Sequence, residues 1–213
     1  EDQGTPGKVA RRGGRGGGGS TAMNTGAAKA RLRAEVRARL ARMTAGDWAM
    51  ASARVAVVVR GMGEWREARW VGAYAAMPRE IDVAPLMQEA LDRGARVAVP
   101  GWDAASETYR FHEVKDLVRD LVEGPHRARM PAVGCPAVEF GRLDFVLVPG
   151  IAFDTSGGRL GRGKGYYDRL LRPGRGVTCG VGADEQRVED VPMEPHDVRL
   201  NRVAMPGGLF PGG

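Results

Sequence analysis

The chain is poor in cysteine and has no long apolar run. Its 213 residues include two cysteines, Cys135 and Cys179, which lie far apart and belong to no CxxC or histidine-linked pattern. This spacing argues against a zinc site and against a disulfide framework. The longest strongly apolar run, residues 55–59, is far too short to span a bilayer, and no run near the N-terminus resembles a secretory signal. We therefore expect a cytoplasmic protein with no membrane partner.

Basic residues outnumber acidic ones, 32 against 26, which gives a formal net charge of +6. A basic balance favours anionic partners, either nucleic acid or phosphorylated small molecules. The 43% hydrophobic and 27% charged content is typical of a soluble globular protein of one domain. Residues 1–26, which contain the low-complexity stretch 13–20, are expected to form a disordered Gly/Arg-rich tail. Residues 27–213 are expected to form a single domain, which we expect to be monomeric.

Apolar periodicity predicts strands that alternate with helices. Helices are expected over residues 27–43, 82–93 and 166–171, and strands over residues 70–76, 96–100, 109–114, 144–148, 177–181 and 202–205. Thr44, with Asp47 three residues later, indicates a capping box that opens a further helix. That helix should run through residues 55–59, although so many valines leave a strand as the alternative. The alternation predicts an α/β three-layer sandwich with a mostly parallel central sheet and helices on both faces.

A glycine-rich stretch, residues 157–168, follows the predicted strand 144–148. Such a position matters because ligands of α/β sheets bind at the carboxyl ends of strands. Glycines let backbone N–H groups crowd around an anion, and the cations Arg159, Arg162 and Lys164 would neutralise it. The stretch fits the first seven positions of a P-loop, but Gly165 stands where Ser or Thr would bind magnesium. Phosphate binding without the standard P-loop is therefore predicted, with Asp168 as the nearest candidate magnesium ligand.

A longer pattern surrounds this stretch. Residues 145–154, Phe-Val-Leu-Val-Pro-Gly-Ile-Ala-Phe-Asp, followed by residues 159–169, Arg-Leu-Gly-Arg-Gly-Lys-Gly-Tyr-Tyr-Asp-Arg, resemble the signature of the 5-formyltetrahydrofolate cyclo-ligase family, also called 5,10-methenyltetrahydrofolate synthetase. Lys29-x-x-x-Arg33, the segment 77–82, Gln186, the pair 191–192 and the pair 196–197 also resemble the family and arrive in its order. The resemblance covers about residues 29–203.

The resemblance implies a reaction in which ATP and Mg²⁺ drive closure of 5-formyltetrahydrofolate to 5,10-methenyltetrahydrofolate, with ADP and phosphate released. A formamide oxygen is a poor leaving group, so its phosphorylation would let N10 attack the formyl carbon. Such a reaction needs mainly positioning and charge neutralisation. The partners implied are 5-formyltetrahydrofolate and ATP. No nucleic-acid partner is expected, although contact of the Arg/Gly tail with RNA stays an alternative.

By position, the resemblance also implies site residues. The implied catalytic pair is Arg162 and Lys164, which would stabilise the transferring phosphoryl group. The implied magnesium ligands are Asp168 and Asp197. The implied ATP-binding residues are Lys29, Arg33, Arg159, Leu160, Gly161, Arg162, Gly163, Lys164, Gly165, Tyr166 and Tyr167. The implied folate-binding residues are Arg33, Ala75, Glu80, Arg162, Gly163, Lys164, Gly165 and Tyr166.

The sequence departs from the family pattern at one position, and two alternative functions stay open. The family often carries a Gly-Ile-x-Glu-Pro segment before the strand 144–148, and here Cys135 stands where that glutamate would be. His112, His126 and His196 are interpreted as incidental. An ATP-using relative with another substrate is one alternative function. A nucleic-acid-binding protein that uses the Arg/Gly tail on a degenerate form of this fold is the other.

Overall fold

A computed structural model describes residues 18–103, 106–124, 128–171 and 176–213. An eight-stranded sheet forms its centre, in the order β12-β11-β10-β7-β1-β2-β3-β6. The strands β11, β10, β7, β1 and β2 pair in parallel. At one edge β12 pairs antiparallel with β11, and at the other edge β3 pairs antiparallel with β2 and β6 antiparallel with β3. The strands of this sheet are β1 (Trp70–Gly72), β2 (Arg96–Asp103), β3 (Thr108–Val114), β6 (Ala137–Val138), β7 (Phe145–Val148), β10 (Val177–Val181), β11 (Arg202–Met205) and β12 (Gly208–Pro211).

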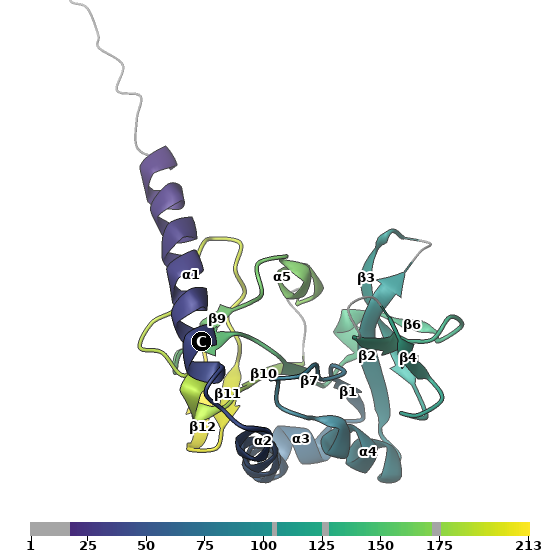
Figure 1. Cartoon of the computed structure of the whole chain (residues 1–213). Coiled ribbons are helices and arrows are strands. Elements are labelled where there is room, and N and C mark those ends of the chain that lie inside the picture. The colour runs from purple at the N-terminus through teal and green to yellow at the C-terminus, as the bar shows by residue number, and fades with distance from the viewer. Residues whose placement is uncertain (1–17, 104–105, 125–127, 172–175) are drawn as a thin grey trace, which may run out of the picture.

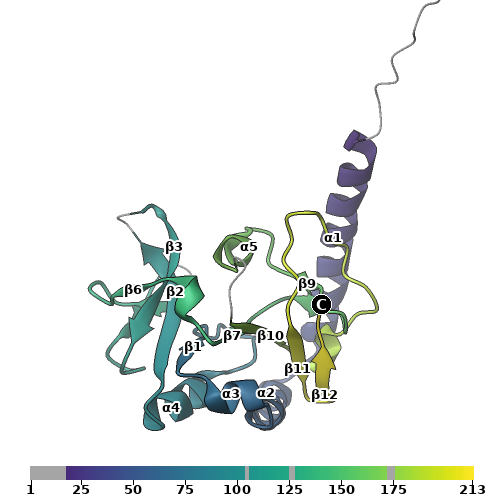
Figure 2. The same cartoon turned by 180° about the vertical axis from the view of Figure 1, so that it is seen from behind.

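Helices and loops cover both faces of the sheet (Figure 1, Figure 2). On one side lie α2 (Ala45–Arg60), α3 (Gly63–Glu67) and α4 (Ala84–Asp92), and the short α5 (Tyr166–Leu170) lies on the other. Because side chains alternate along a strand, Phe145 and Leu147 of β7 enter one apolar cluster while Val146 and Val148 enter the other. The predicted α/β architecture, with a mostly parallel sheet between helices, is confirmed.

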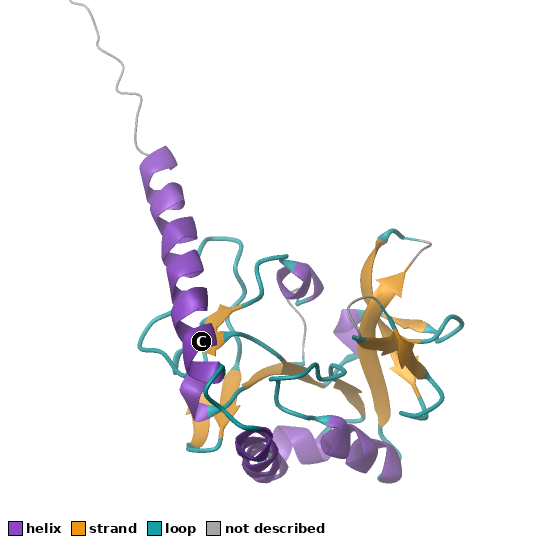
Figure 3. Ribbon diagram, in the orientation of Figure 1, coloured by secondary structure: helices purple, strands orange, loops and turns teal. Residues whose placement is uncertain are grey.

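The longest helix, α1 (Gly18–Leu40), stands beside the β12 end of the sheet and rises well past it (Figure 3). Its C-terminal half contributes Val36 and Leu40 to the core. The helix begins at Gly18 rather than at the predicted residue 27, and the division of the chain into a tail over residues 1–26 and one domain over residues 27–213 stays a prediction. The rest of the predicted tail, residues 1–17, lies outside the described residues. None of the described helices is long and apolar enough to cross a membrane.

Most predicted elements are confirmed, with shifted ends. The capping box at Thr44 is present, and α2 continues through residues 55–59, so the strand alternative is wrong. The first strand ends at Gly72 rather than at residue 76, because after the Ala73 N–H bonds to the Ala98 carbonyl the chain leaves the sheet. The predictions did not include β12, β6 or the short pairs β4 (Leu121–Glu123) with β5 (Arg129–Pro131) and β8 (Ala152–Phe153) with β9 (Arg159–Leu160).

Candidate active site

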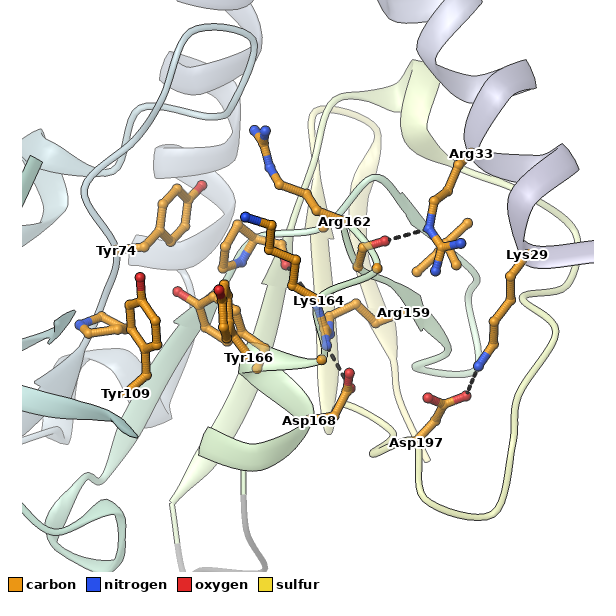
Figure 4. A pocket seen from close by; sticks show the side chains of 18 of the residues that line it. Lys29, Arg33, Tyr74, Tyr109, Arg159, Arg162, Lys164, Tyr166, Asp168 and Asp197 are labelled. Atoms are coloured by element: carbon orange, nitrogen blue, oxygen red, sulfur yellow. Dashed lines mark hydrogen bonds and ion pairs between the residues drawn. The ribbon is translucent and has the colours of Figure 1, made fainter. Parts of the chain in front are cut away.

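A cavity of about 440 Å³ opens at the carboxyl ends of the parallel strands (Figure 4). Pro149 and Gly150, which follow β7, form part of its wall, and so does Pro100 of β2. This is the location predicted for a ligand in such a sheet. The cavity is lined by every residue that the sequence analysis assigned to a site, namely Lys29, Arg33, Ala75, Glu80, Arg159, Leu160, Gly161, Arg162, Gly163, Lys164, Gly165, Tyr166, Tyr167, Asp168 and Asp197.

The glycine-rich stretch forms one wall of the cavity. It begins as the β8–β9 hairpin and continues without regular structure until α5 begins at Tyr166. Gly163 and Gly165 have φ angles of 98° and 63°, a backbone conformation that favours glycine. Lys164 between them is exposed toward the cavity. The glycines therefore set the backbone path that places this cation at the cavity wall.

Helix α1 supplies two cations from the opposite end of the chain. Lys29 and Arg33 lie one turn apart on one helix face. Arg33 Nε donates to the carbonyl oxygen of Gly161 at 2.9 Å, which ties α1 to the glycine-rich stretch. Lys29 is 8% exposed, and its ammonium donates to Glu194 at 2.6 Å and to Asp197 at 2.5 Å (Figure 4).

This buried lysine and its carboxylates stabilise one another's charged forms. Burial alone would lower the pKa of Lys29, but hydrogen bonds to Asp197 and Glu194 offset this effect and the pKa is raised. Burial would likewise raise the pKa of Asp197, but the hydrogen bond from Lys29 and the backbone N–H of Glu194 lower it. Lys29 and Asp197 therefore both stay ionised over a wide pH range.

The structure pairs Arg159 with Asp168. The two side chains lie 2.7 Å apart, and only 3% of the Arg159 side chain is exposed. Its guanidinium also lies 5.5 Å from the centre of the Tyr167 ring, and its Nε is buried without a hydrogen-bond partner among the described residues. Arg159, which was predicted to bind ATP, thus directs its guanidinium at Asp168 and presents only part of its surface to the cavity.

One group of side chains could hold a metal ion. Ligand atoms of Glu194, His196 and Asp197 lie within 4.8 Å of one another. The two carboxylates are hard oxygen donors of the kind that Mg²⁺ prefers, whereas imidazole is the less suitable ligand. Asp168, the other predicted magnesium ligand, does not belong to this cluster. The donor set near Asp197 therefore fits Mg²⁺ that keeps water or phosphate oxygens as its remaining ligands.

The opposite wall of the cavity is aromatic and carries one carboxylate. Glu80 accepts a hydrogen bond from Arg162 at 2.7 Å and another from the Met77 N–H at 2.9 Å. The ring of Tyr109 on this wall lies 4.4 Å, between centres, from the ring of Tyr166 near the end of the glycine-rich stretch. Burial raises the pKa of Tyr109. This wall offers flat apolar surface with a few polar groups, as sites for aromatic ligands do.

Sequence reasoning missed several residues of this cavity. Glu194 received no role and His196 was interpreted as incidental, yet both lie beside Asp197. A carboxylate and a histidine within three residues of a predicted ligand were the available signal. Tyr109 was predicted only as a strand residue, and nothing in the sequence indicated its contact with Tyr166.

Cys135 and two of the three histidines lie away from the cavity or outside the described residues. Cys135, the departure from the family pattern, does not line the cavity, and its thiol lies 3.8 Å from the Asp120 carbonyl oxygen. His112 does not line it either, and its Nδ1 lies 3.0 Å from the Cys135 carbonyl oxygen. His126 lies outside the described residues.

Comparison with known proteins agrees with the resemblance seen in the sequence. The sequence model of the 5-formyltetrahydrofolate cyclo-ligase family matches residues 25–206. A 5-formyltetrahydrofolate cyclo-ligase from Mycolicibacterium smegmatis is 36% identical over 143 residues, covering 65% of this chain and 74% of the relative. One from Mus musculus is 25% identical over 194 residues, covering 85% and 95%.

A solved structure supports the same assignment. The NMR structure of Aquifex aeolicus 5,10-methenyltetrahydrofolate synthetase superposes with a TM-score of 0.74 at 28% sequence identity, covering 86% of this chain and 92% of that one. The structure of a Mycoplasma pneumoniae 5,10-methenyltetrahydrofolate synthetase shares the fold, with a TM-score of 0.64 at 17% identity. The chain, with its matching signature, fold and family model, belongs to the 5-formyltetrahydrofolate cyclo-ligase family and is an enzyme of that family.

Proposed function

We propose that this enzyme converts 5-formyltetrahydrofolate to 5,10-methenyltetrahydrofolate with hydrolysis of Mg-ATP to ADP and phosphate. The observation that carries the proposal is one cavity in which a cation-rich glycine wall faces an aromatic wall with one carboxylate. A phosphate donor suits the first wall and a folate suits the second. Arg162 reaches from the first wall to Glu80 on the second, where the two substrates would meet.

On the phosphate side, the proposal uses the charges of α1 and the glycine-rich stretch. Arg33 is already fixed against Gly161, so its guanidinium can approach an anion held by that stretch. Lys164 is exposed at the same wall, and its ammonium lies 5.8 Å from the centre of the Tyr166 ring. We assign Arg162 and Lys164 to stabilisation of the transferring phosphoryl group, since such a group spreads negative charge over its oxygens.

On the folate side, Glu80 is the acceptor that paired N–H donors of a pterin ring would need. Its side chain is 10% exposed and is oriented by the Met77 N–H, so little reorganisation would be required. Arg162 now occupies one of its oxygens. Folate binding would therefore release Arg162 from Glu80, and the freed guanidinium could turn toward the phosphoryl group.

The metal belongs on the phosphate side. Glu194 and Asp197 would hold Mg²⁺ together with phosphate oxygens, and Asp168 is assigned to it from the family resemblance. When bound, Mg²⁺ neutralises charge on the phosphates. Lys29 bridges the same two carboxylates and holds their segment against α1. Arg159 donates a hydrogen bond to Asp168 and so holds that carboxylate of α5 in place.

The chemistry proceeds in two displacements. The formyl oxygen attacks the γ-phosphorus and the bond from that phosphorus to ADP breaks. N10 then forms a bond to the formyl carbon and loses its proton, and the carbon–oxygen bond breaks as phosphate leaves. The residues need only bind, orient and neutralise charge, because the leaving group is made by phosphorylation rather than by an acid.

The test is to mix the protein with 5-formyltetrahydrofolate, Mg²⁺ and ATP, and to follow methenyltetrahydrofolate by its near-ultraviolet absorbance. We expect product only when all three are present. Lys164→Ala should lower kcat/KM by about 100-fold without changing the unfolding temperature, because it removes charge at the reacting group. Lys115→Ala, at an exposed lysine that does not line the cavity, is the control. Release of ADP without methenyl product would instead favour another substrate.

A further inference from the structure

The carboxylate of Asp154, outside the cavity, holds two chain segments that form the phosphate side of the cavity. Asp154 follows β8, is 2% exposed and does not line the cavity. Its Oδ1 accepts hydrogen bonds from the Ser156 N–H at 2.9 Å, the Ser156 hydroxyl at 2.7 Å and the Gly158 N–H at 2.8 Å. Its Oδ2 accepts one from the Val191 N–H at 3.0 Å. The four donors belong to two separate segments of the chain.

The first segment is the turn that begins the glycine-rich stretch. Asp154 and Gly158 close the β8–β9 hairpin, and β9 leads directly to Arg162 and Lys164. Gly158 has no room for a side chain, since a Cβ there would lie 2.1 Å from Asp154 Oδ2. The glycine at this position therefore lets the carboxylate reach across the turn.

The second segment is the stretch 191–200, which carries Glu194 and Asp197. Asp154 holds its beginning through the Val191 N–H. The same turn holds its end, because the Leu200 N–H donates to the Gly157 carbonyl at 2.9 Å and Arg199 donates to the Ser156 hydroxyl at 2.8 Å. One five-residue turn thus fixes both ends of the segment that faces Lys29.

We propose that Asp154 is a positioning residue for catalysis, which sets the glycine-rich stretch and the Glu194–Asp197 segment at the spacing that the phosphates require. The inference rests on the proposed use of these two walls for Mg-ATP. The carboxylate is held ionised by a hydroxyl and three backbone N–H groups. Such a network is rigid because each donor that loses its acceptor is left buried and unpaired.

Asp154→Asn separates the two links. An amide retains one acceptor oxygen, and the lower-cost orientation keeps it toward the three donors of the hairpin turn. Its NH2 group then faces the Val191 N–H, so the link to the second segment is lost. We expect the KM for ATP to rise about tenfold or more, with the KM for 5-formyltetrahydrofolate unchanged within about twofold.

Amide hydrogen exchange gives a readout that does not depend on turnover. In Asp154→Asn, peptides that contain Val191 should exchange faster, while peptides from β7 and β10 should be unchanged. Ser156→Ala is a milder second variant, because it removes one donor to Asp154 and the acceptor of Arg199. It should change the same peptides and raise the KM for ATP about two- to threefold.

Asp144→Asn is the matched control. Asp144 also accepts two backbone N–H groups, those of Arg69 and Trp70 at 2.9 Å, but it lies at the amino end of β7, away from the cavity. It should lower stability without changing the KM for ATP. If Asp154→Asn changes both KM values equally, or leaves the exchange of the Val191 peptides as in the wild type, Asp154 is not the positioning residue. If the wild-type chain itself gives no product, the proposed function fails, and the exchange experiment still decides whether Asp154 joins the two segments.

Discussion

The turn that presents Glu80 contains a strained residue. Arg79 has a φ angle of 65°, in the left-handed region that residues other than glycine adopt at a cost. The turn is closed by the Glu80 N–H, which donates to the Met77 carbonyl, and by the Met77 N–H, which donates to Glu80 Oε2. The strain is therefore stored next to the carboxylate that meets Arg162, where backbone strain accompanies function in many sites.

Arg79→Gly should stabilise the protein by about 0.5 to 1 kcal/mol, because relief of the left-handed strain exceeds the extra chain entropy of glycine in the unfolded state. Urea unfolding measures the change. Arg79→Ala is the control, since it removes the guanidinium but keeps a Cβ in the strained conformation. If the alanine variant gains as much stability as the glycine variant, the side chain rather than the backbone carries the effect.

For single residues, the sequence could identify residue types but not their partners. The cations of the glycine-rich stretch were predicted to face an anion, and in the structure Arg159 faces Asp168 and Arg162 faces Glu80. Lys29 and Arg33 were predicted to act together, yet Lys29 bridges two carboxylates and Arg33 binds a backbone carbonyl. Such pairings depend on segments that no local pattern relates.

Among the elements, α2 is the one whose boundary the sequence specified most directly. The Thr44 hydroxyl accepts from the Asp47 N–H at 3.2 Å, and Asp47 Oδ2 accepts from the Thr44 N–H at 2.7 Å. The backbone hydrogen bond from Thr44 is the main reason that the pKa of Asp47 is lowered. The cap resolves the ambiguity of residues 55–59, because a helix that starts at Ala45 and buries Val55 and Val59 continues through them.

Thr44→Ala should lower the free energy of unfolding by about 1 kcal/mol, because the first turn of α2 loses an acceptor for an otherwise unpaired N–H. Chemical denaturation followed by circular dichroism measures the loss. Thr44→Ser retains the hydroxyl and should lose much less. Equal losses in the two variants would show that the threonine methyl group, and not the cap, matters.

The strands show where element prediction failed. Strand β10 was predicted with correct ends; it lies between β7 and β11, and four of its five residues are buried. Strand β1 was predicted too long, because its last residues leave the sheet to line the cavity as Tyr74 and Ala75. Short edge strands such as β6 were not predicted. Their pairing is decided by the neighbouring strand rather than by their own periodicity.

Across the whole molecule, the pair of Lys29 with Asp197 joins α1 to the C-terminal segment, 168 residues apart in sequence. Asp154 is a buried carboxylate whose pKa is also lowered: burial would raise it, but hydrogen bonds from Ser156, Val191 and Gly158 outweigh that effect. A lowered pKa contributes stability that is present above the ordinary value of 3.8 and is lost as the pH falls through the folded value. The raised pKa of Lys29 contributes stability that is present below 10.5 and is lost as the pH rises through its folded value.

We therefore expect the free energy of unfolding to fall as the pH drops below about 4, and to fall again above about pH 10.5. Urea titrations at several pH values measure both limbs. In Asp197→Asn the free energy of unfolding should fall less steeply in acid, because the side chain at this position no longer titrates. It should also fall less steeply at alkaline pH, because Lys29 loses a charged partner. Limbs as steep in that variant as in the wild type would show that other groups control the pH dependence.

The sequence by itself determined the α/β class, the capped second helix and the glycine signature that marks the family. These features follow from local rules: side-chain periodicity, capping chemistry and the backbone freedom of glycine. Only the tertiary structure decided which cation meets which carboxylate, that Lys29 bridges Glu194 and Asp197, and that Asp154 joins two segments. The physical reason is that these contacts link residues from distant parts of the chain. The strand order β10-β7-β1-β2 brings them to one edge of the sheet, and no short stretch of sequence encodes that order.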